Sequence, residues 1–343
     1  MISPFEQRRL KDAKGLLFVY QFGWLRTAEL GKLMWPDSPD NRHAADRLAR
    51  SWIERQLVIV RDLPGGAGRA LVLATAGVRL LAENGIKSGS GKGIGQTNDD
   101  GWLPPASWRH DLIAHGVLCE LHRRGYHVYP EMELRRRAEG YPKIPDGFAV
   151  KDGEGIYLEV ENARKSGYEM RKLADALSIV ASGQAASIAG FTPNAAMVAF
   201  LPSAIDERGY NLSHQTRVRN AIQGVAKNDL SIYWAECKLL GSAGVGQVDI
   251  QKELICTDRA SRVLKILDAW GWHPHQDDGK YSSYNKHIAH VWEDDHGWCY
   301  SVNTFDGQLV EANHSATITE AKQAAASVLA RIEQPGRTRS AAT

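Results

Sequence analysis

The sequence predicts an α/β protein of three parts, because the pattern of apolar residues changes twice along its 343 residues. The first part shows helical spacing followed by a hairpin pattern. The middle part follows the order α-β-β-β-α-β, and the last part is rich in Trp, His and Asp with strand-like alternation. A chain of this length exceeds one ordinary core, and 43% hydrophobic residues suffice for more than one.

Residues 1–85 are expected to hold three helices, a strand hairpin and a closing helix. Thr27 suits the N-cap of the second helix, and a turn at Pro64–Gly66 separates two aliphatic runs. The expected helices are Arg8–Phe22, Thr27–Met34, about Asn41–Gln56 and Thr75–Glu83, and the expected strands are Leu57–Arg61 and Arg69–Leu73.

This order of elements is that of a winged helix-turn-helix, in which the third helix enters the DNA major groove and the hairpin contacts the backbone. The apolar stripe of the third helix consists of Ala44, Leu48, Trp52 and Ile53. Four arginines cover the rest of its surface: Arg42, Arg47, Arg50 and Arg55. We therefore predict DNA contacts from Arg42, Arg47 and Arg50; the alternative is a winged helix that binds protein.

Residues 86–107 are rich in Gly and Ser and are expected to form a flexible linker. The run Gly91-Lys92-Gly93 does not qualify as a phosphate-binding loop. Its lysine is followed by glycine rather than Ser or Thr, and no buried strand precedes it.

The second part, residues 108–250, is expected to follow the order α-β-β-β-α-β. Gly125 ends its first helix, and Lys151–Gly155 reads as the turn of a hairpin. The expected helices are Arg109–Arg124, about Gly167–Ala181 and about Gln215–Ala226. The expected strands are Tyr126–Leu134, Gly147–Val150, Ile156–Glu161, Ala196–Leu201 and Ser231–Glu236.

Two carboxylates one residue apart mark the third of these strands. Glu159 and Glu161 point to one face and Leu158 to the other, because side chains alternate along a strand. Asp146 reaches the acidic face from the neighbouring strand. Three oxygen ligands of this kind suit Mg²⁺ or Mn²⁺ and point to metal-assisted cleavage of a phosphodiester. The alternative is the solvated face of an edge strand.

The Pro145-Asp146 pair followed by Glu159-x-Glu161 on the next strand resembles the PD-(D/E)xK nuclease superfamily, which has a restriction-endonuclease-like core. More closely, the chain resembles the replication-relaxation family of plasmid and integrative-element proteins, which includes MobC-type mobilisation relaxases. The resemblance covers roughly residues 5–240. The segments that carry it, after the winged helix, are Trp108–Leu112, Glu131–Arg135, Leu158–Glu161 and Arg164–Ser166.

The resemblance implies that Asp146 and Glu159 bind the metal ion. Most of the superfamily has a lysine two residues after the second acid, where this chain has Glu161. Glu161 would then act as a general base or as a further metal ligand. The missing positive charge would come from Lys165 or from Lys143; if neither reaches the site, the domain binds DNA without cutting it.

Further candidates surround this acidic strand. His110 is expected to hydrogen-bond to Asp146 or Glu131, and Glu131 is itself a candidate accessory carboxylate. Tyr210 is a candidate nucleophile for covalent nicking, because tyrosine can carry DNA as a phosphotyrosine; a packing role is the alternative. The expected phosphate contacts are Arg135, Arg136, Arg164, His214, Arg217 and Arg219.

The third part, residues 251–333, is expected to be a small β-β-β-α domain, and residues 334–343 a disordered tail. Its strands are expected at His290–Tyr300 and Ser301–Asn313. A helix is expected to begin at Thr317, where Thr317 and Glu320 have capping-box spacing. The tryptophans are expected in its core, with stacking on single-stranded DNA as the alternative.

The composition bears on the cellular compartment of the protein and on its expected partners. Four cysteines far apart argue against a disulfide framework or structural zinc and fit a reducing cytoplasm. No apolar run suffices to span a bilayer. The net charge of +2 does not itself argue for nucleic acid. The expected partners are duplex DNA, single-stranded DNA at an origin and a second copy of the chain, without a membrane.

Together these patterns predict a divalent-metal-dependent DNA endonuclease or nickase, acting at a plasmid or mobile-element origin. The alternative is a non-catalytic DNA-binding regulator, or a replication or mobilisation accessory protein, whose nuclease-like fold serves as a scaffold. The glutamate in the usual lysine position, Glu161, is the main argument for that alternative.

Overall fold

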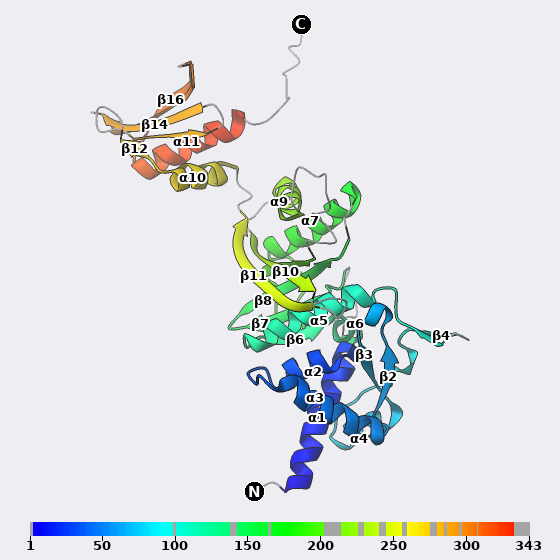
Figure 1. Ribbon diagram of the computed structural model, residues 1–343. Coiled ribbons are helices and arrows are strands. Elements are labelled where there is room, and N and C mark those ends of the chain that lie inside the picture. Colours follow the sequence, from blue (N-terminus) through cyan, green and yellow to red (C-terminus); the bar gives the residue numbers. More distant parts are fainter. Residues whose placement is uncertain are drawn as a thin grey trace. The chain divides into compact units, whose positions relative to one another are not determined.

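The computed structural model describes the chain apart from residues 1–2, 99–100, 138–142, 164–165, 202–213, 226–229, 240–244, 256–258, 275–279, 285–286, 295–296, 307 and 333–343. The expected tail of residues 334–343 lies outside the described residues. The protein is mixed α/β, as predicted, and divides into two compact units (Figure 1). The first unit extends to Leu254, and the second follows from Ile255.

The first unit begins with the expected succession of helices and a hairpin. Its helices are α1 (Pro4–Phe22), α2 (Thr27–Met34), α3 (Asn41–Glu54) and α4 (Thr75–Glu83), and its strands β1 (Trp24–Leu25), β2 (Val58–Asp62) and β3 (Arg69–Leu73) pair in the order β1-β3-β2. Helix α1 begins four residues earlier than expected, because Ser3 and Glu6 form a capping box. The backbone N–H of Glu6 donates to Ser3 Oγ at 3.2 Å, and that of Ser3 donates to Glu6 Oε2 at 2.9 Å.

Helix α3 is rotated slightly from the expected orientation. It buries Ala45, Leu48, Ala49 and Trp52. Ile53, which was expected in the stripe, is instead 38% exposed. The buried carboxylate of Asp12 sets this rotation, because it accepts hydrogen bonds from Trp52 Nε1 and from the Arg55 guanidinium, both at 2.8 Å. Arg55 therefore serves the fold, whereas Arg42, Arg47 and Arg50 remain exposed.

The expected flexible linker, residues 86–107, instead carries defined structure. It contains a short 3₁₀ helix at Gly91–Gly93 and the hairpin of β4 (Gln96–Asn98) and β5 (Gly101–Leu103). Ser90 Oγ donates to the carbonyl of Leu73 at 3.2 Å, and Trp102 Nε1 donates to that of Ile94 at 2.8 Å. The apolar side chains of Ile94 and Trp102 pack against a small core. The high Gly and Ser content of the segment led to the prediction of a flexible linker instead.

A six-stranded sheet follows in the order β11-β10-β9-β8-β7-β6. The pairs β6–β7 and β7–β8 are antiparallel, whereas β8–β9 and β9–β10 are parallel. The six strands are β6 (His127–Pro130), β7 (Gly147–Lys151), β8 (Glu154–Glu161), β9 (Ala195–Phe200), β10 (Leu230–Leu239) and β11 (Val245–Ile255). The expected core strands are present, but β11 was not predicted.

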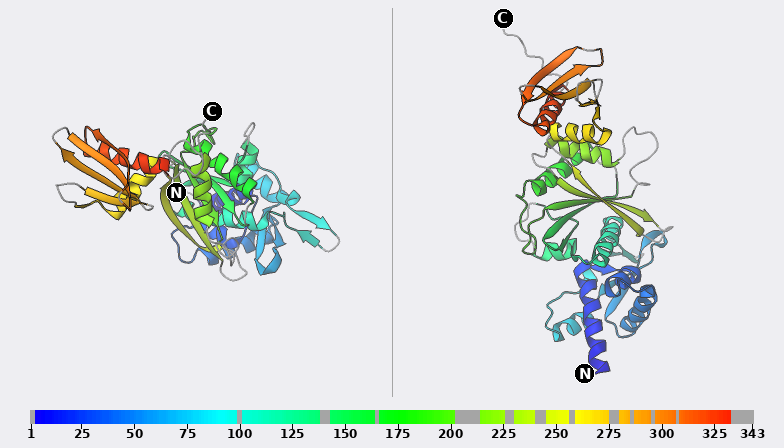
Figure 2. Two further views of the ribbon diagram at one scale, coloured as in Figure 1. Left: turned by 90° about the horizontal axis from the view of Figure 1, so that it is seen from above. Right: turned by 90° about the vertical axis from the view of Figure 1, so that its left-hand side faces the viewer.

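Helices cover both faces of this sheet (Figure 2). Helix α5 (Trp108–Arg123) packs on one face, where Leu118 meets Leu158 and Val160 in the main core. Helices α7 (Gly167–Ala181) and α9 (His214–Val225) lie on the other, which carries Phe200 against His214 of α9. Both faces of β8 are therefore buried, which excludes the alternative of a solvated face on an edge strand.

The strand expected to continue through Glu131 and Leu134 ends at Pro130. A helix, α6 (Glu131–Arg137), begins there instead. Proline lacks the N–H needed to continue the strand pairing, and its fixed φ suits a helix start. Glutamates in the first turn and arginines in the last favour the helix dipole, and Glu131 pairs with Arg135 at 2.5 Å.

The second unit is a five-stranded antiparallel sheet with helices. Its strands are β12 (His273–Pro274), β13 (Lys280–Tyr284), β14 (His287–Asp294), β15 (Gly297–Thr304) and β16 (Leu309–Ser315), in that spatial order, and its helices are α10 (Arg259–Trp270) and α11 (Ile318–Ile332). It thus exceeds the expected β-β-β-α unit by one helix and two strands. Val263 of α10 and Leu329 of α11 share a core with Val291 and Val302 of the sheet. Trp272 and Trp298 pack against that core, whereas Trp292 lies next to Val291 and so on the opposite face.

No helix among the described residues has the length and apolarity to cross a bilayer.

The helical first part and the central sheet share one continuous apolar cluster, which includes Leu16 of α1 and Val160 of β8. Arg136 of α6 reinforces the junction: its guanidinium lies 3.9 Å from the Tyr20 ring centroid and donates to the Tyr20 carbonyl at 2.7 Å. His115 of α5 lies between the rings of Phe22 and Trp24, with centroids 5.0 Å and 4.8 Å away.

His115 should make the stability of the first unit sensitive to acid. Burial lowers its pKa to about 4; Asp111 and Glu29 favour its protonation, whereas Arg26 and His110 oppose it. The unfolded chain, with a histidine pKa near 6.5, binds this proton first as the pH falls. In the wild type, this should lower the unfolding free energy by up to about 3 kcal/mol between pH 6.5 and pH 4. We expect His115→Phe not to show this decrease.

Urea titrations of wild type and His115→Phe at several pH values would measure this loss. The difference between the two proteins isolates the histidine from the carboxylates that titrate in the same range. Parallel stability curves for both proteins down to pH 4 would contradict the assignment.

Candidate functional site

Asp146 directly precedes β7 and lies beside the last residues of β8. Its backbone N–H donates to the Leu158 carbonyl at 3.0 Å, and its Oδ2 accepts from the backbone N–H of Val160 at 2.7 Å. The same Oδ2 lies 3.0 Å from His110 Nε2 of α5. Asp146 is thus held against β8 on one side and α5 on the other. The predicted hydrogen bond of His110 is made to Asp146 rather than Glu131.

His110 carries a positive charge at neutral pH. Burial lowers its pKa, but the carboxylates of Asp111 and Asp146 outweigh that effect and raise it to about 10. The imidazolium therefore donates a hydrogen bond to Asp146 Oδ2. His110 therefore helps to orient Asp146.

Glu159 of β8 is the second acid of the site, and its side chain is only 3% exposed. Lys143 Nζ lies 2.5 Å from its Oε2, and the hydroxyl of Tyr157 also interacts with this carboxylate. Burial, and next the charge of Asp146, raise the pKa of Glu159 above its ordinary value; Lys143 opposes them. Asp146 and Glu159 are therefore close enough to repel each other, and a cation between them would relieve that repulsion.

Glu161 lies two residues further along β8 on the same face, opposite Phe200 of β9, and is 1% exposed. The expected convergence of Asp146, Glu159 and Glu161 on one ion is not seen: within the described part of the chain, no three His, Cys, Asp or Glu side chains are grouped closely enough to hold a metal. The structure brings together the pair Asp146 and Glu159.

This pair fits a divalent cation by the chemistry of its donors. Carboxylate oxygens are the ligands that Mg²⁺ and Mn²⁺ prefer. Glu159 Oε1 is buried, and the nearby charge of Asp146 disfavours the ionised form of Glu159 unless a cation compensates it. Lys143 already places one positive charge at the other oxygen. Of the two lysines considered from the sequence, Lys143 reaches the acids, and Lys165 lies outside the described residues, as do Arg164 and Tyr210.

Several residues expected to contact DNA are used inside the fold instead. Arg136 stacks on Tyr20, and Arg135 forms an ion pair with Glu131. Arg219 binds Glu253 through both guanidinium nitrogens, at 2.8 and 2.7 Å. His214 is fully buried against Phe200. Burial contradicts the expected phosphate contact of His214, whereas Arg135 and Arg136 remain exposed and Arg217 is half-buried on α9.

A groove of ≈ 820 Å³ between α2, α3 and the β2–β3 hairpin gathers exposed cations. Arg42 and Arg50 line it from α3, and Arg69 lines it from the start of β3. Arg47 is exposed on the same helix but does not line the groove. The cations at the rim give the groove a positive character that suits a phosphate backbone.

Arg26 supports the hairpin side of this groove. Its guanidinium donates to Glu29 Oε2 at 2.8 Å and to the carbonyl of Ala67, at the hairpin turn, at 3.0 Å. Sequence reasoning missed Lys32 and Arg69 as groove residues. The signal for Arg69 was present, because it is a basic residue that directly follows the glycine-rich turn of a predicted wing.

Comparison of the chain with protein-family models, with curated proteins and with solved structures found no match. The resemblance to the replication-relaxation family therefore rests on the quoted residues and the order of elements, and it stays a prediction.

Proposed function

We propose that this protein is a divalent-metal-dependent DNA endonuclease, which nicks one strand at an origin on a plasmid or mobile element. The observation that carries the proposal is the pair of half-buried Asp146 and buried Glu159. Asp146 directly precedes β7 and Glu159 lies on the neighbouring strand β8, and the two acids are close enough to repel each other. Buried acids in this arrangement are costly to a fold unless they serve a site.

Each residue of the site has a distinct role in the proposed reaction. Asp146 and Glu159 hold Mg²⁺ or Mn²⁺, which when bound polarises the scissile phosphate and lowers the pKa of its water. Lys143, with a side chain 47% exposed, supplies positive charge to the phosphoryl oxygens in place of the lysine that Glu161 replaces. His110 is a positioning residue, because it acts on Asp146 and not on the DNA.

The first part of the chain would bring this site to its target. The order α1, α2, α3 and the β2–β3 hairpin supports a winged helix, and α5 followed by β6–β9 supports a restriction-endonuclease-like core. Exposed Arg42 and Arg50 in the groove would contact the duplex backbone and the major groove.

A non-catalytic DNA-binding protein is the second candidate, and one observation favours it. Lys143 and Glu159 form an ion pair at 2.5 Å, which satisfies part of the acidic site without any metal. Under this alternative the winged helix binds DNA and the central sheet is a scaffold.

A plasmid assay separates the two candidates. Supercoiled DNA is incubated with the full chain in Mg²⁺, in Mn²⁺ and in EDTA, and the relaxed product is measured. We expect relaxation only with metal, and its loss in Asp146→Asn. The matched control is Asp152→Asn, the same change at the exposed turn at the other end of β7, where φ of +48° suits asparagine. Equal relaxation by Asp146→Asn and wild type, or none by wild type, would reject the endonuclease.

A further inference from the structure

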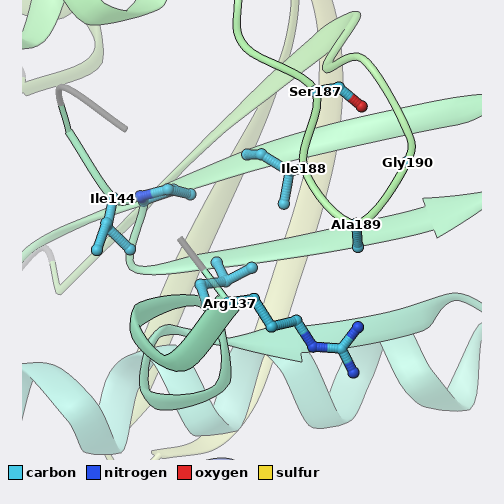
Figure 3. Close-up of a pocket in the computed structure, with 8 residues that line it drawn as sticks. Arg137, Ile144, Ser187, Ile188, Ala189 and Gly190 are labelled. Carbon is cyan, nitrogen blue, oxygen red and sulfur yellow. The ribbon is translucent and has the colours of Figure 1, made fainter. Parts of the chain in front are cut away.

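A small pocket opens beside the acidic pair, between α6 and the loop of residues 187–190. Its volume is ≈ 200 Å³. Figure 3 shows Ile144 on one side and the loop from Ser187 to Gly190 on the other, with Ala189 directed toward the pocket and Arg137 along its lower edge. Pro145 also lines it and directly precedes Asp146, so the pocket adjoins the proposed site of cleavage.

The lining of this pocket suits a flat ring with a polar edge. Leu134, Pro145 and Ile188 are buried apolar walls. Arg137 adds a planar cation that is held by Glu133 and lies 5.5 Å from the Tyr129 ring. The volume is below the roughly 300–1,000 Å³ of pockets for drug-sized ligands, so a single ring system is the appropriate size of guest. Nucleobases stack on apolar and guanidinium planes of this kind.

The loop that closes the pocket holds a strained backbone. Ala189 has φ of +51° and Gly190 φ of +88°, which places an alanine in the left-handed region. The backbone groups of Ile188 and Phe191 exchange two hydrogen bonds, at 2.8 and 2.9 Å, and close a two-residue turn. Strain at a non-glycine residue persists only where its surroundings hold it, and it is concentrated at ligand sites.

We infer that this pocket receives one unstacked nucleobase of the strand whose phosphate lies at Asp146 and Glu159. The inference rests on the proposed function and names its substrate: a strand that is single or locally melted. A paired base cannot enter, because its edge and both faces are occupied within the duplex. The protein would therefore nick an opened origin in preference to continuous duplex.

The pocket can be blocked without harming the loop. Ala189→Asn places a larger side chain in the pocket, and asparagine tolerates the left-handed region better than alanine. Gln56→Asn is the matched control, since Gln56 has φ of +56° and lies at the end of α3, outside the pocket. Arg137→Gln is a second test variant, which removes the planar cation and leaves the loop unchanged.

The probe is the 5′-monophosphate of 2-aminopurine deoxyriboside, a fluorescent base whose anisotropy rises when it binds a protein of this size. We expect wild type and Gln56→Asn to bind it equally, and Ala189→Asn and Arg137→Gln at least 10-fold more weakly. Thermal midpoints of all four proteins report whether each is folded. No rise in anisotropy with folded wild type, or equal binding by both pocket variants, would overturn the inference.

The plasmid assay distinguishes failure of the pocket from failure of the proposed function. Probe binding that is lost in the pocket variants, in a protein without metal-dependent nicking, supports the pocket and rejects the endonuclease. Metal-dependent nicking by wild type, with probe binding unaffected by both pocket variants, rejects the pocket and leaves the endonuclease standing.

Discussion

Glu159→Gln is expected to abolish metal-dependent cleavage and, at the same time, to stabilise the metal-free protein. Glutamine keeps the shape of the side chain but loses the charge that would hold the cation, and loss of a charge-stabilising group at a reaction centre costs about 10²–10³ in rate. Burial and Asp146 already disfavour the ionised form of Glu159 in the folded protein. A neutral side chain therefore raises the midpoint of urea unfolding in EDTA.

Glu154→Gln, at the other end of the same strand, is the matched control and should show the opposite pattern. Glu154 accepts hydrogen bonds from the hydroxyls of Tyr126 and Tyr233, both at 2.7 Å, and from Lys252 at 2.9 Å. Loss of its charge weakens these contacts and lowers the unfolding midpoint, while cleavage continues. A Glu159→Gln protein that cleaves like wild type, or that unfolds at lower urea, would contradict the assignment.

Arg42→Ala and Arg50→Ala are each expected to weaken duplex binding about 10-fold at low salt. Both side chains are exposed at the groove between α3 and the hairpin. Each phosphate contact that is lost should also reduce the slope of log K against log salt concentration by about 0.9. Fluorescence anisotropy with a labelled duplex, titrated at several salt concentrations, measures affinity and slope together.

Arg79→Ala is the control for nonspecific loss of charge. Arg79 is exposed on α4 and does not line the groove, so its removal changes the net charge by the same amount. Affinity and slope should stay within a small factor of wild type. If all three variants weaken binding equally, the groove is not the DNA-binding surface.

Elements with strong local signals could be predicted from the sequence. Helices α2 and α4 have the expected bounds, because an apolar stripe and a clear turn define each of them. The approach of Asp146 to Glu159 and the hydrogen bond of His110 were also predictable, since they follow from a hairpin and a helix of ordinary geometry. Strand β11 was missed, although Val248 and Ile250 alternate with exposed polar residues.

Features that depend on tertiary packing could not be predicted in the same way. Alternation along β8 shows that its two faces differ, but not that α7 and α9 cover the acidic one. Similarly, the sequence did not indicate that Arg136 would donate a hydrogen bond to the Tyr20 carbonyl, or that Arg219 would form an ion pair with Glu253. The partner of Glu159 depends on the path of the chain before Pro145, which brings Lys143 to the site.

The apolar cluster that joins α1–α4 to the central sheet has a consequence for truncation. Removing the helical part would uncover the side of α5 that carries His115, Cys119 and His122, which contact Phe22, the Glu29 carbonyl and the Leu33 carbonyl, so the shortened sheet would be less stable on its own. Reading and cutting DNA would then belong to a single cooperative folding unit. Recombination could then not exchange the helical part for another without also changing the residues of the central sheet that pack against it.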